Sequence, residues 1–224
     1  MSSYFIKEGY KTNKGTITYV CEDKKIAAIY QTAVYQFAQK IIRKHKLQSL
    51  LDIGCGNGDK LQRFIYPFCS DITGVDTKKI IEYCKKEYSF GKLFIDNVEN
   101  SQVDFNRKFD IILASDIIEH LTDPDTLLQY IKKYAHDNTQ IIISTPERDA
   151  IRDITTVGPP ENPFHVREWN QKEFAAYLSS QGFIIHKHFL VHDFKKSILR
   201  QLITFLRFKK NRTCQIVLCT FSSL

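Results

Sequence analysis

Three glycines stand at alternate positions directly after an apolar run in the segment LLDIGCGNGDKL, residues 50–61. Gly54, Gly56 and Gly58 leave the main chain bare just where a helix is expected to begin. Backbone N–H groups at such a place bind polar ligand groups closely. A dinucleotide site uses the spacing G-x-G-x-x-G, whereas these residues read G-x-G-x-G and follow Asp52. The pattern therefore favours a ligand without a pyrophosphate.

Acidic residues end two further apolar runs. Asp76 closes ITGVD eighteen residues after Gly58, and Asp96 closes FID. A carboxylate at the end of the second strand accepts hydrogen bonds from ribose hydroxyls, and one at the end of the third strand lies level with an adenine amino group. Together the three strand ends predict an adenosine site. A NAD-type site or a purely structural turn is the alternative for the glycines alone.

Short apolar runs alternate with helix-like segments along the chain, which predicts strands covered by crossover helices. The strand candidates are SLLDI, DITGV, KLFI, FDIILA, TQIIIST, FIIHKHFLV and TCQIVLCTF. The helix candidates are Asp23–Leu47, Lys60–Tyr66, Lys78–Tyr88, Asp116–Leu121, Pro124–Tyr134, Gln171–Ser180 and Phe194–Phe208. Residues 146–169, with four prolines, predict a long ordered loop of the kind that is usually functional. The fold class is α/β, a doubly wound sandwich.

The segments LLDIGCGNG, GVD, FIDN and FDIILASDIIEHLTDPDTLL, in this order, resemble the successive motifs of class I S-adenosylmethionine-dependent methyltransferases over residues 50–144. The resemblance implies S-adenosyl-L-methionine as cofactor and S-adenosyl-L-homocysteine as product. It also implies a Rossmann-like, mostly parallel seven-stranded sheet with an antiparallel last strand. The implied cofactor residues are Asp52, Gly54, Cys55, Gly56 and Gly58 at the methionine moiety, Asp76 and Thr77 at the ribose, Asp96 and Asn97 at the adenine, and Ser115 beside the cofactor.

A second segment, STPERD…GPPENPFHVREW, resembles a narrower methyltransferase type 11/12-like group often associated with sugar or glycan modification. His165 stands there beside Arg167, Glu168 and Trp169. A titratable ring, a cation, a carboxylate and an aromatic side chain within five residues can line an acceptor pocket. With Arg148, the last three are the expected substrate-binding residues. Burial of Trp169 in the core is an equally weighted alternative.

Methyl transfer to a hydroxyl needs alignment first and a base second. His165 is the first candidate base and His120 the second, although His120 is as readily explained by a role in shaping its loop. The leading hypothesis is O-methylation of a sugar or glycan hydroxyl. The alternatives are a nucleic-acid or other small-molecule methyltransferase, and a non-catalytic cofactor-binding subunit that supports a glycosyltransferase or another methylase.

Charge is distributed unevenly within a net of +7, since residues 1–46 carry +6, residues 47–186 carry −6 and residues 187–224 carry +7. The basic ends suit an anionic partner such as nucleic acid, or else a plain solvated surface. The basic amphipathic stretch 194–210 could touch an anionic membrane, but covering the sheet or the active site is preferred. His186, His188 and His192 alternate without a carboxylate pair, so no metal is predicted.

Length and composition predict a single methyltransferase domain over residues 1–224. Its expected parts are an N-terminal extension and helix (1–47), a cofactor-binding half (48–145) and an acceptor-side part (146–224). The first residues are polar and expected to be loosely held. With no long apolar window, no secretory signal and six scattered cysteines, we expect a cytoplasmic protein with free thiols.

Overall fold

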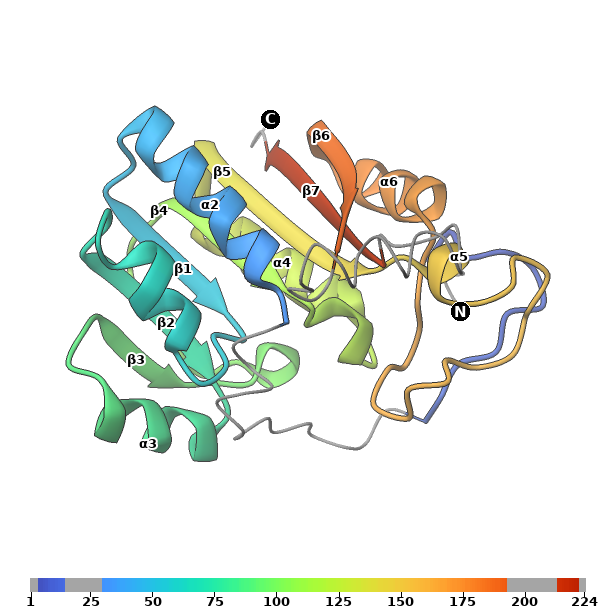
Figure 1. Cartoon of the computed structure of the whole chain (residues 1–224), viewed down its shortest axis with the longest axis horizontal. Helices are drawn as coiled ribbons and strands as arrows, with labels where there is room; N and C mark the ends of the chain where they lie inside the picture. Colours follow the sequence, from blue (N-terminus) through green and yellow to red (C-terminus); the bar gives the residue numbers. More distant parts are fainter. Residues whose placement is uncertain (1–3, 15–29, 193–212, 222–224) are drawn as a thin grey trace, which may run out of the picture.

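A computed structural model of the chain describes residues 4–14, 30–192 and 213–221. Seven strands form one sheet in the order β3-β2-β1-β4-β5-β7-β6 (Figure 1). The strands are β1 (Ser49–Ile53), β2 (Asp71–Asp76), β3 (Lys92–Ile95), β4 (Phe109–Ser115), β5 (Ala135–Pro146), β6 (Phe183–Val191) and β7 (Cys214–Phe221). β1 to β5 pair in parallel, and β7 is antiparallel to β5 and β6. The predicted sheet is confirmed.

Helices cover both faces of the sheet, so central strands such as β1 and β4 bury both sets of their side chains, whereas the edge strands β3 and β6 are partly exposed. On one face α2 (Thr32–His45) and α3 (Lys78–Glu87) pack over a core that includes Leu50. On the other face α4 (Pro124–Tyr134) and α6 (Gln171–Ser180) pack over a core that includes Leu51 (Figure 1). Successive strand residues point to opposite faces, which explains why the strands read as unbroken apolar runs.

Several elements differ from their predicted form. The segment around residues 60–66 forms a single π-helical turn, η1 (Leu61–Ile65). The predicted helix after β4 is only the 3₁₀ turn η3 (Ile118–His120), and a second 3₁₀ turn, η2 (Val98–Asn100), follows β3. The long loop after β5 contains a short helix, α5 (Arg148–Ile151). These turns follow directly after strands, where the chain must reverse within a few residues.

Some expectations fall on residues outside the described ranges. These are the beginning of the first predicted helix (residues 23–29), the basic helix Phe194–Phe208 with its proposed membrane contact, and Cys21. Within the described ranges, Cys55, Cys69, Cys84, Cys214 and Cys219 are free thiols, as predicted. No helix in those ranges has both the length and the apolar character needed to cross a bilayer.

Candidate active site

The glycine turn joins the end of β1 to η1, and its backbone requires glycine. Gly54, Gly56 and Gly58 have φ of +74°, +56° and +77°, a region that side chains rarely adopt. A Cβ added at Gly54 would lie 3.1 Å from the Ile117 side chain, whereas one added at Gly56 would meet nothing within 4 Å. The space above Gly56 is therefore open, and an incoming ligand can reach the main chain there.

Asp52 lies beneath this turn with no exposed surface. Its Oδ2 accepts a hydrogen bond from the Tyr35 hydroxyl at 2.8 Å, while Oδ1 has no hydrogen-bond partner. Burial raises the pKa of Asp52 to about 7, against the lowering effects of the Tyr35 hydrogen bond and of the charge on Lys60. A buried carboxylate with an unused oxygen is costly, and a positively charged ligand group would stabilise it.

Asp76 ties the end of β2 to the glycine turn. Its Oδ1 accepts the N–H of Thr77 at 2.7 Å and its Oδ2 accepts the N–H of Gly56 at 2.9 Å. Burial raises the pKa of Asp76, and the two backbone hydrogen bonds oppose that rise. The buried Thr77 Oγ1 has no hydrogen-bond partner. Each carboxylate oxygen keeps a second lone pair, so Asp76 remains able to accept from a ligand hydroxyl.

Asp96 directly follows β3, the strand next to β2. Its carboxylate shapes the loop that comes after β3. It accepts from the N–H groups of Asn97 and Gln102 and from the hydroxyls of Ser101 and Tyr130. The Asn97 side chain in turn caps η2 by accepting the N–H of Glu99 at 3.1 Å. Asp96 therefore fixes the position of this loop, and its expected place beside an adenine stays a prediction.

These residues fit an adenosyl cofactor. The open main chain at Gly56, the unused oxygen of Asp52 and the unpartnered hydroxyl of Thr77 all lie at the carboxyl ends of β1 and β2. In open α/β sheets, ligands bind at this edge. One ligand that carries a cationic group and hydroxyl groups would interact with all three of these features.

The end of β4 is a second strained turn beside the first. Asp116 has φ of +51°, which is rare for a residue with a side chain and is typical of functional sites. Its Oδ1 accepts the hydroxyl of Ser144 at 2.5 Å, and burial raises its pKa. Ser115 is only 2% exposed and its hydroxyl is 3.1 Å from that of Ser144. Its hydroxyl therefore interacts with the neighbouring strand β5, and its expected place beside the cofactor stays a prediction.

A cluster of titratable groups lies just beyond Asp116. Ligand atoms of Glu119, His120 and His165 lie within 4.8 Å of one another, although His165 is far away in the sequence. His120 Nδ1 is 2.9 Å from the carbonyl oxygen of Phe164, and burial lowers the pKa of His120 to about 4, so its ring is neutral. His165 Nδ1 is 2.7 Å from Glu168 Oε1. We call Glu119, His120, His165 and Glu168 the acceptor cluster.

The acceptor cluster adjoins the cofactor edge. Lys60 interacts electrostatically with Asp52 under the glycine turn and with Asp116, and Asp116 interacts with His165. Asp116, at the carboxyl end of β4, therefore interacts electrostatically with groups on both the cofactor side and the acceptor side.

All four expected substrate-binding residues are buried instead. Trp169 has no exposed surface, stacks on Tyr177 and donates its indole N–H to the Tyr4 carbonyl at 3.0 Å. Arg148 is 1% exposed and pairs with Glu173 through both terminal nitrogens. A fully packed ring and a doubly paired guanidinium have no surface left for an acceptor, so the structure corrects both expectations toward a packing role.

Arg167 and Glu168 also serve the loop itself. Arg167 is 5% exposed and donates to the carbonyl oxygens of Leu121 and Thr122, which fixes the segment after η3. This corrects its expected contact with substrate, because both terminal nitrogens are already used. Glu168 is 1% exposed; its Oε1 lies 2.7 Å from His165 Nδ1 and its Oε2 lies 3.4 Å from an Arg152 nitrogen. Glu168 is therefore a positioning residue.

Residues 4–14 belong to the segment that was expected to be loosely held, but hydrogen bonds to a distant loop hold them in place. Residues 4–14 run beside the loop after β5 (Figure 1). The Asn13 amide donates to the carbonyl oxygens of Pro160, Asn162 and His165. The Tyr10 hydroxyl accepts the N–H of Glu168 at 2.9 Å and an Arg152 N–H at 2.8 Å. We call residues 4–14 the N-terminal strap, since they hold the loop that carries His165.

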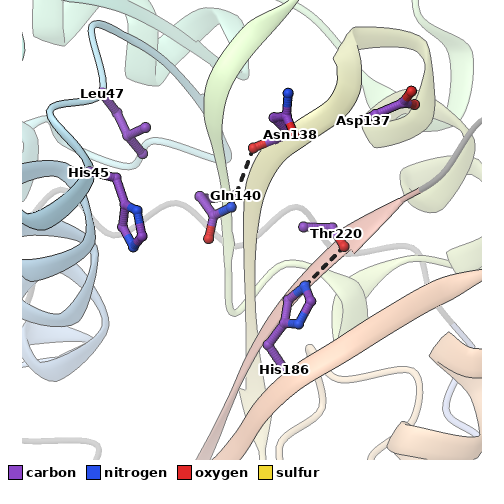
Figure 2. Close-up of a pocket in the computed structure, with 7 residues that line it drawn as sticks. All are labelled: His45, Leu47, Asp137, Asn138, Gln140, His186 and Thr220. Carbon is purple, nitrogen blue, oxygen red and sulfur yellow. Dashed lines mark hydrogen bonds between the residues drawn. The ribbon is translucent and has the colours of Figure 1, made fainter.

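A separate pocket of about 480 Å³ lies at the opposite edge of the sheet. Figure 2 shows its lining, where Gln140 bonds to Asn138 and His186 Nε2 lies 2.9 Å from Thr220 Oγ1. These residues lie at the amino end of β5 and on the paired segments of β6 and β7. The pocket is therefore remote from the glycine turn and is not part of the cofactor site.

Sequence reasoning missed several residues of the site. Asp116 and Glu119 are three residues apart in SDIIEH. This D-x-x-E spacing places two carboxylates about one turn apart, so the sequence did contain a signal for this part of the site. Tyr35 and Tyr10 gave no such signal. Their partners, Asp52 and Glu168, come from other elements and are set by tertiary packing.

Comparison with known proteins agrees with this geometry. A family model described as a methyltransferase domain matches residues 23–188. The ubiquinone biosynthesis O-methyltransferase of Pelagibacter ubique (strain HTCC1062) is 33% identical over 122 residues, 48% of this chain and 49% of that protein. The chain spans between 49% and 61% of the length of three such curated relatives.

Solved structures show the same fold. An S-adenosylmethionine-dependent methyltransferase from Clostridium acetobutylicum ATCC 824 matches with a TM-score of 0.64 and 15% identity, over 90% of this chain and 96% of that one. The N-methyltransferase NodS from Bradyrhizobium japonicum WM9, in complex with S-adenosyl-L-homocysteine, matches with a TM-score of 0.61 and 13% identity, over 90% and 93%. Because the family model covers most of its length, the chain belongs to the class I S-adenosylmethionine-dependent methyltransferases.

Proposed function

We propose that this methyltransferase transfers its methyl group to a hydroxyl oxygen of a small molecule. The observation that carries the proposal is the pair formed by His165 and the buried Glu168, 2.7 Å apart, beside Asp116 at the end of β4. A hydroxyl is a weak nucleophile that must lose its proton during attack, so a histidine oriented by a carboxylate suits this acceptor. Relatives named as O-methyltransferases also support oxygen as the acceptor atom.

The bound cofactor supplies an electrophilic methyl group, and the protein contributes alignment and proton transfer. Glu168 accepts the Nδ1–H of His165, which leaves the lone pair of that ring on Nε2. In this structure the Asn162 amide lies 2.8 Å from Nε2, in the place where an acceptor hydroxyl would donate. His165 is therefore the first candidate base. His120 stays second, because its low pKa of about 4 makes it a weak base.

The class of acceptor has two supported candidates. The loop from Pro146 to Trp169 resembles segments linked to sugar modification, which supports a sugar or glycan hydroxyl. The curated relatives instead act in ubiquinone biosynthesis by their names, which supports an intermediate of that pathway.

A label-transfer assay tests the proposal. Purified protein is incubated with methyl-labelled S-adenosylmethionine and a panel of free sugars, nucleotide sugars, phenols, catechols and RNA, and the labelled product is hydrolysed to identify the methylated atom. We expect an O-methyl product on one small-molecule class, lost in His165→Ala. Label on nitrogen, or on RNA alone, contradicts the proposal. Cofactor binding without turnover on any acceptor would favour the non-catalytic subunit.

A further inference from the structure

We propose that Glu119, His120 and His165 bind one divalent transition-metal ion at the acceptor side of the site. Their ligand atoms lie within 4.8 Å of one another. Bonds of about 2 Å to zinc place neighbouring ligand atoms about 3 to 4 Å apart, so a small closing movement completes the geometry. Two imidazoles and one carboxylate form a ligand set that zinc, iron and manganese accept.

Both histidines are already oriented as metal ligands usually are. A metal-bound imidazole donates its second ring N–H to a carboxylate or a backbone carbonyl. His165 Nδ1 meets the carboxylate of Glu168 at 2.7 Å, and His120 Nδ1 meets the carbonyl of Phe164 at 2.9 Å. Since each acceptor requires the proton on Nδ1, both rings carry their lone pair on Nε2. The two rings lie edge to face, with centroids 4.9 Å apart and planes at 79° to each other.

Glu119 supplies an independent observation. Its side chain has no exposed surface; Oε2 accepts the Thr145 hydroxyl at 3.0 Å, and Oε1 has no hydrogen-bond partner. A buried carboxylate oxygen without a partner costs free energy that a bound cation would recover. The backbone of Glu119 is also anchored, because its carbonyl accepts the N–H of Val166 at 2.7 Å, next to His165 in the sequence.

Three protein ligands leave coordination positions open for water or for an acceptor oxygen. A metal ion there would lower the pKa of a bound hydroxyl and hold its oxygen in place. This role rests on the proposed function, but the binding of the metal does not. His165 would then act as a ligand rather than as the base, and the Asn162 amide at its Nε2 would have to move aside.

Titration with Co²⁺, followed by visible absorption and calorimetry, tests the site without any acceptor. We expect one ion per chain, with bands typical of four or five ligands, and at least a hundredfold weaker binding in Glu119→Gln and His165→Ala. His186→Ala, at the far edge of the sheet, should bind as the unaltered protein does. Asn162→Ala should bind several-fold more tightly, because it frees His165 Nε2.

Wild-type protein alone gives a second measurement, in case a variant does not fold. The ¹⁵N resonances of both His120 and His165 should shift on addition of Zn²⁺. A folded protein that binds no Co²⁺ or Zn²⁺ overturns the proposal, and so does binding that persists in the double variant His120→Ala/His165→Ala. Methyl transfer that continues unchanged with a strong chelator would refute the metal's role and leave the O-methylation itself standing.

Discussion

The two halves of this site are built in opposite ways. On the cofactor side, the bare main chain and the carboxylates belong to one short stretch of chain, from Asp52 to Asn97. The strands of this stretch end at one edge of the sheet. On the acceptor side, Glu119 and His120 meet His165 from a distant loop, and the N-terminal strap holds that loop from the other end of the chain. The first half depends on backbone shape and the second on long-range side-chain contacts.

This difference predicts which property of the enzyme each substitution should impair. Changes on the cofactor side should weaken cofactor binding while the acceptor side stays in place. Changes on the acceptor side should lower turnover while cofactor binding stays unchanged. The variants below separate the two halves, beginning with the largest expected effect.

Replacing His165 by alanine should lower kcat by about 100- to 10,000-fold, since the variant loses the residue that receives or directs the acceptor proton. The dissociation constant of S-adenosylmethionine, measured by calorimetry, should stay within about twofold of the wild-type value. His186→Ala is the matched control and should retain full activity. A His165→Ala variant that loses cofactor affinity as well would show that the two halves are not separable.

Replacing Gly56 by alanine should weaken S-adenosylmethionine binding by about tenfold to a hundredfold, because the new methyl group occupies the open space above the turn. The positive φ should cost only about 1 kcal/mol in the free energy of unfolding. Gly91→Ala is the control: its Cβ would lie 2.8 Å from the Ile72 carbonyl oxygen, far from the turn. It should lose more stability and bind cofactor normally, and the reverse pattern would contradict the assigned site.

Asp52 should make cofactor binding depend on pH. Its pKa of about 7 means that the folded protein gains the negative charge only as pH rises through neutrality. S-adenosylmethionine, a cation at sulfur, should therefore bind up to about tenfold more tightly at pH 8 than at pH 6, and Asp52→Asn should abolish this difference. Calorimetry at several pH values measures it.

The raised pKa of Asp52 also makes the free energy of unfolding depend on pH. The unfolded chain loses this proton near the ordinary value of 3.8, whereas the folded chain keeps it to about 7. The contribution of Asp52 to the free energy of unfolding is thus largest at low pH and falls as pH rises from about 4 to about 7. Glu147, whose pKa burial also raises to about 7, is the control. Glu147→Gln should reduce the same stability slope without changing the pH dependence of cofactor binding.

Replacing Tyr10 by phenylalanine should have the smallest effect. It removes the oxygen that accepts the Glu168 N–H and an Arg152 N–H, and a buried donor left unpaired costs about 1 to 3 kcal/mol. We expect kcat to fall up to about tenfold with unchanged cofactor affinity. Tyr66→Phe, on a ring that is 42% exposed, should change neither quantity. Unchanged kcat in Tyr10→Phe would show that the strap does not position His165.

The sequence by itself determined the sheet and the cofactor edge. Parallel strands that are buried on both faces must be apolar throughout, and their carboxyl ends must meet at one edge, so the sequence already predicted that Gly54, Asp76 and Asp96 lie at the same edge of the sheet. Only the tertiary structure decided the acceptor side. Whether Trp169 faces a ligand or the core, and whether residues 4–14 hold the loop, depends on contacts between segments more than a hundred residues apart. Arg148 is held by Glu173, which lies on α6. Local sequence periodicity does not predict such contacts, because the pattern within each segment is the same whether or not the other segment packs against it.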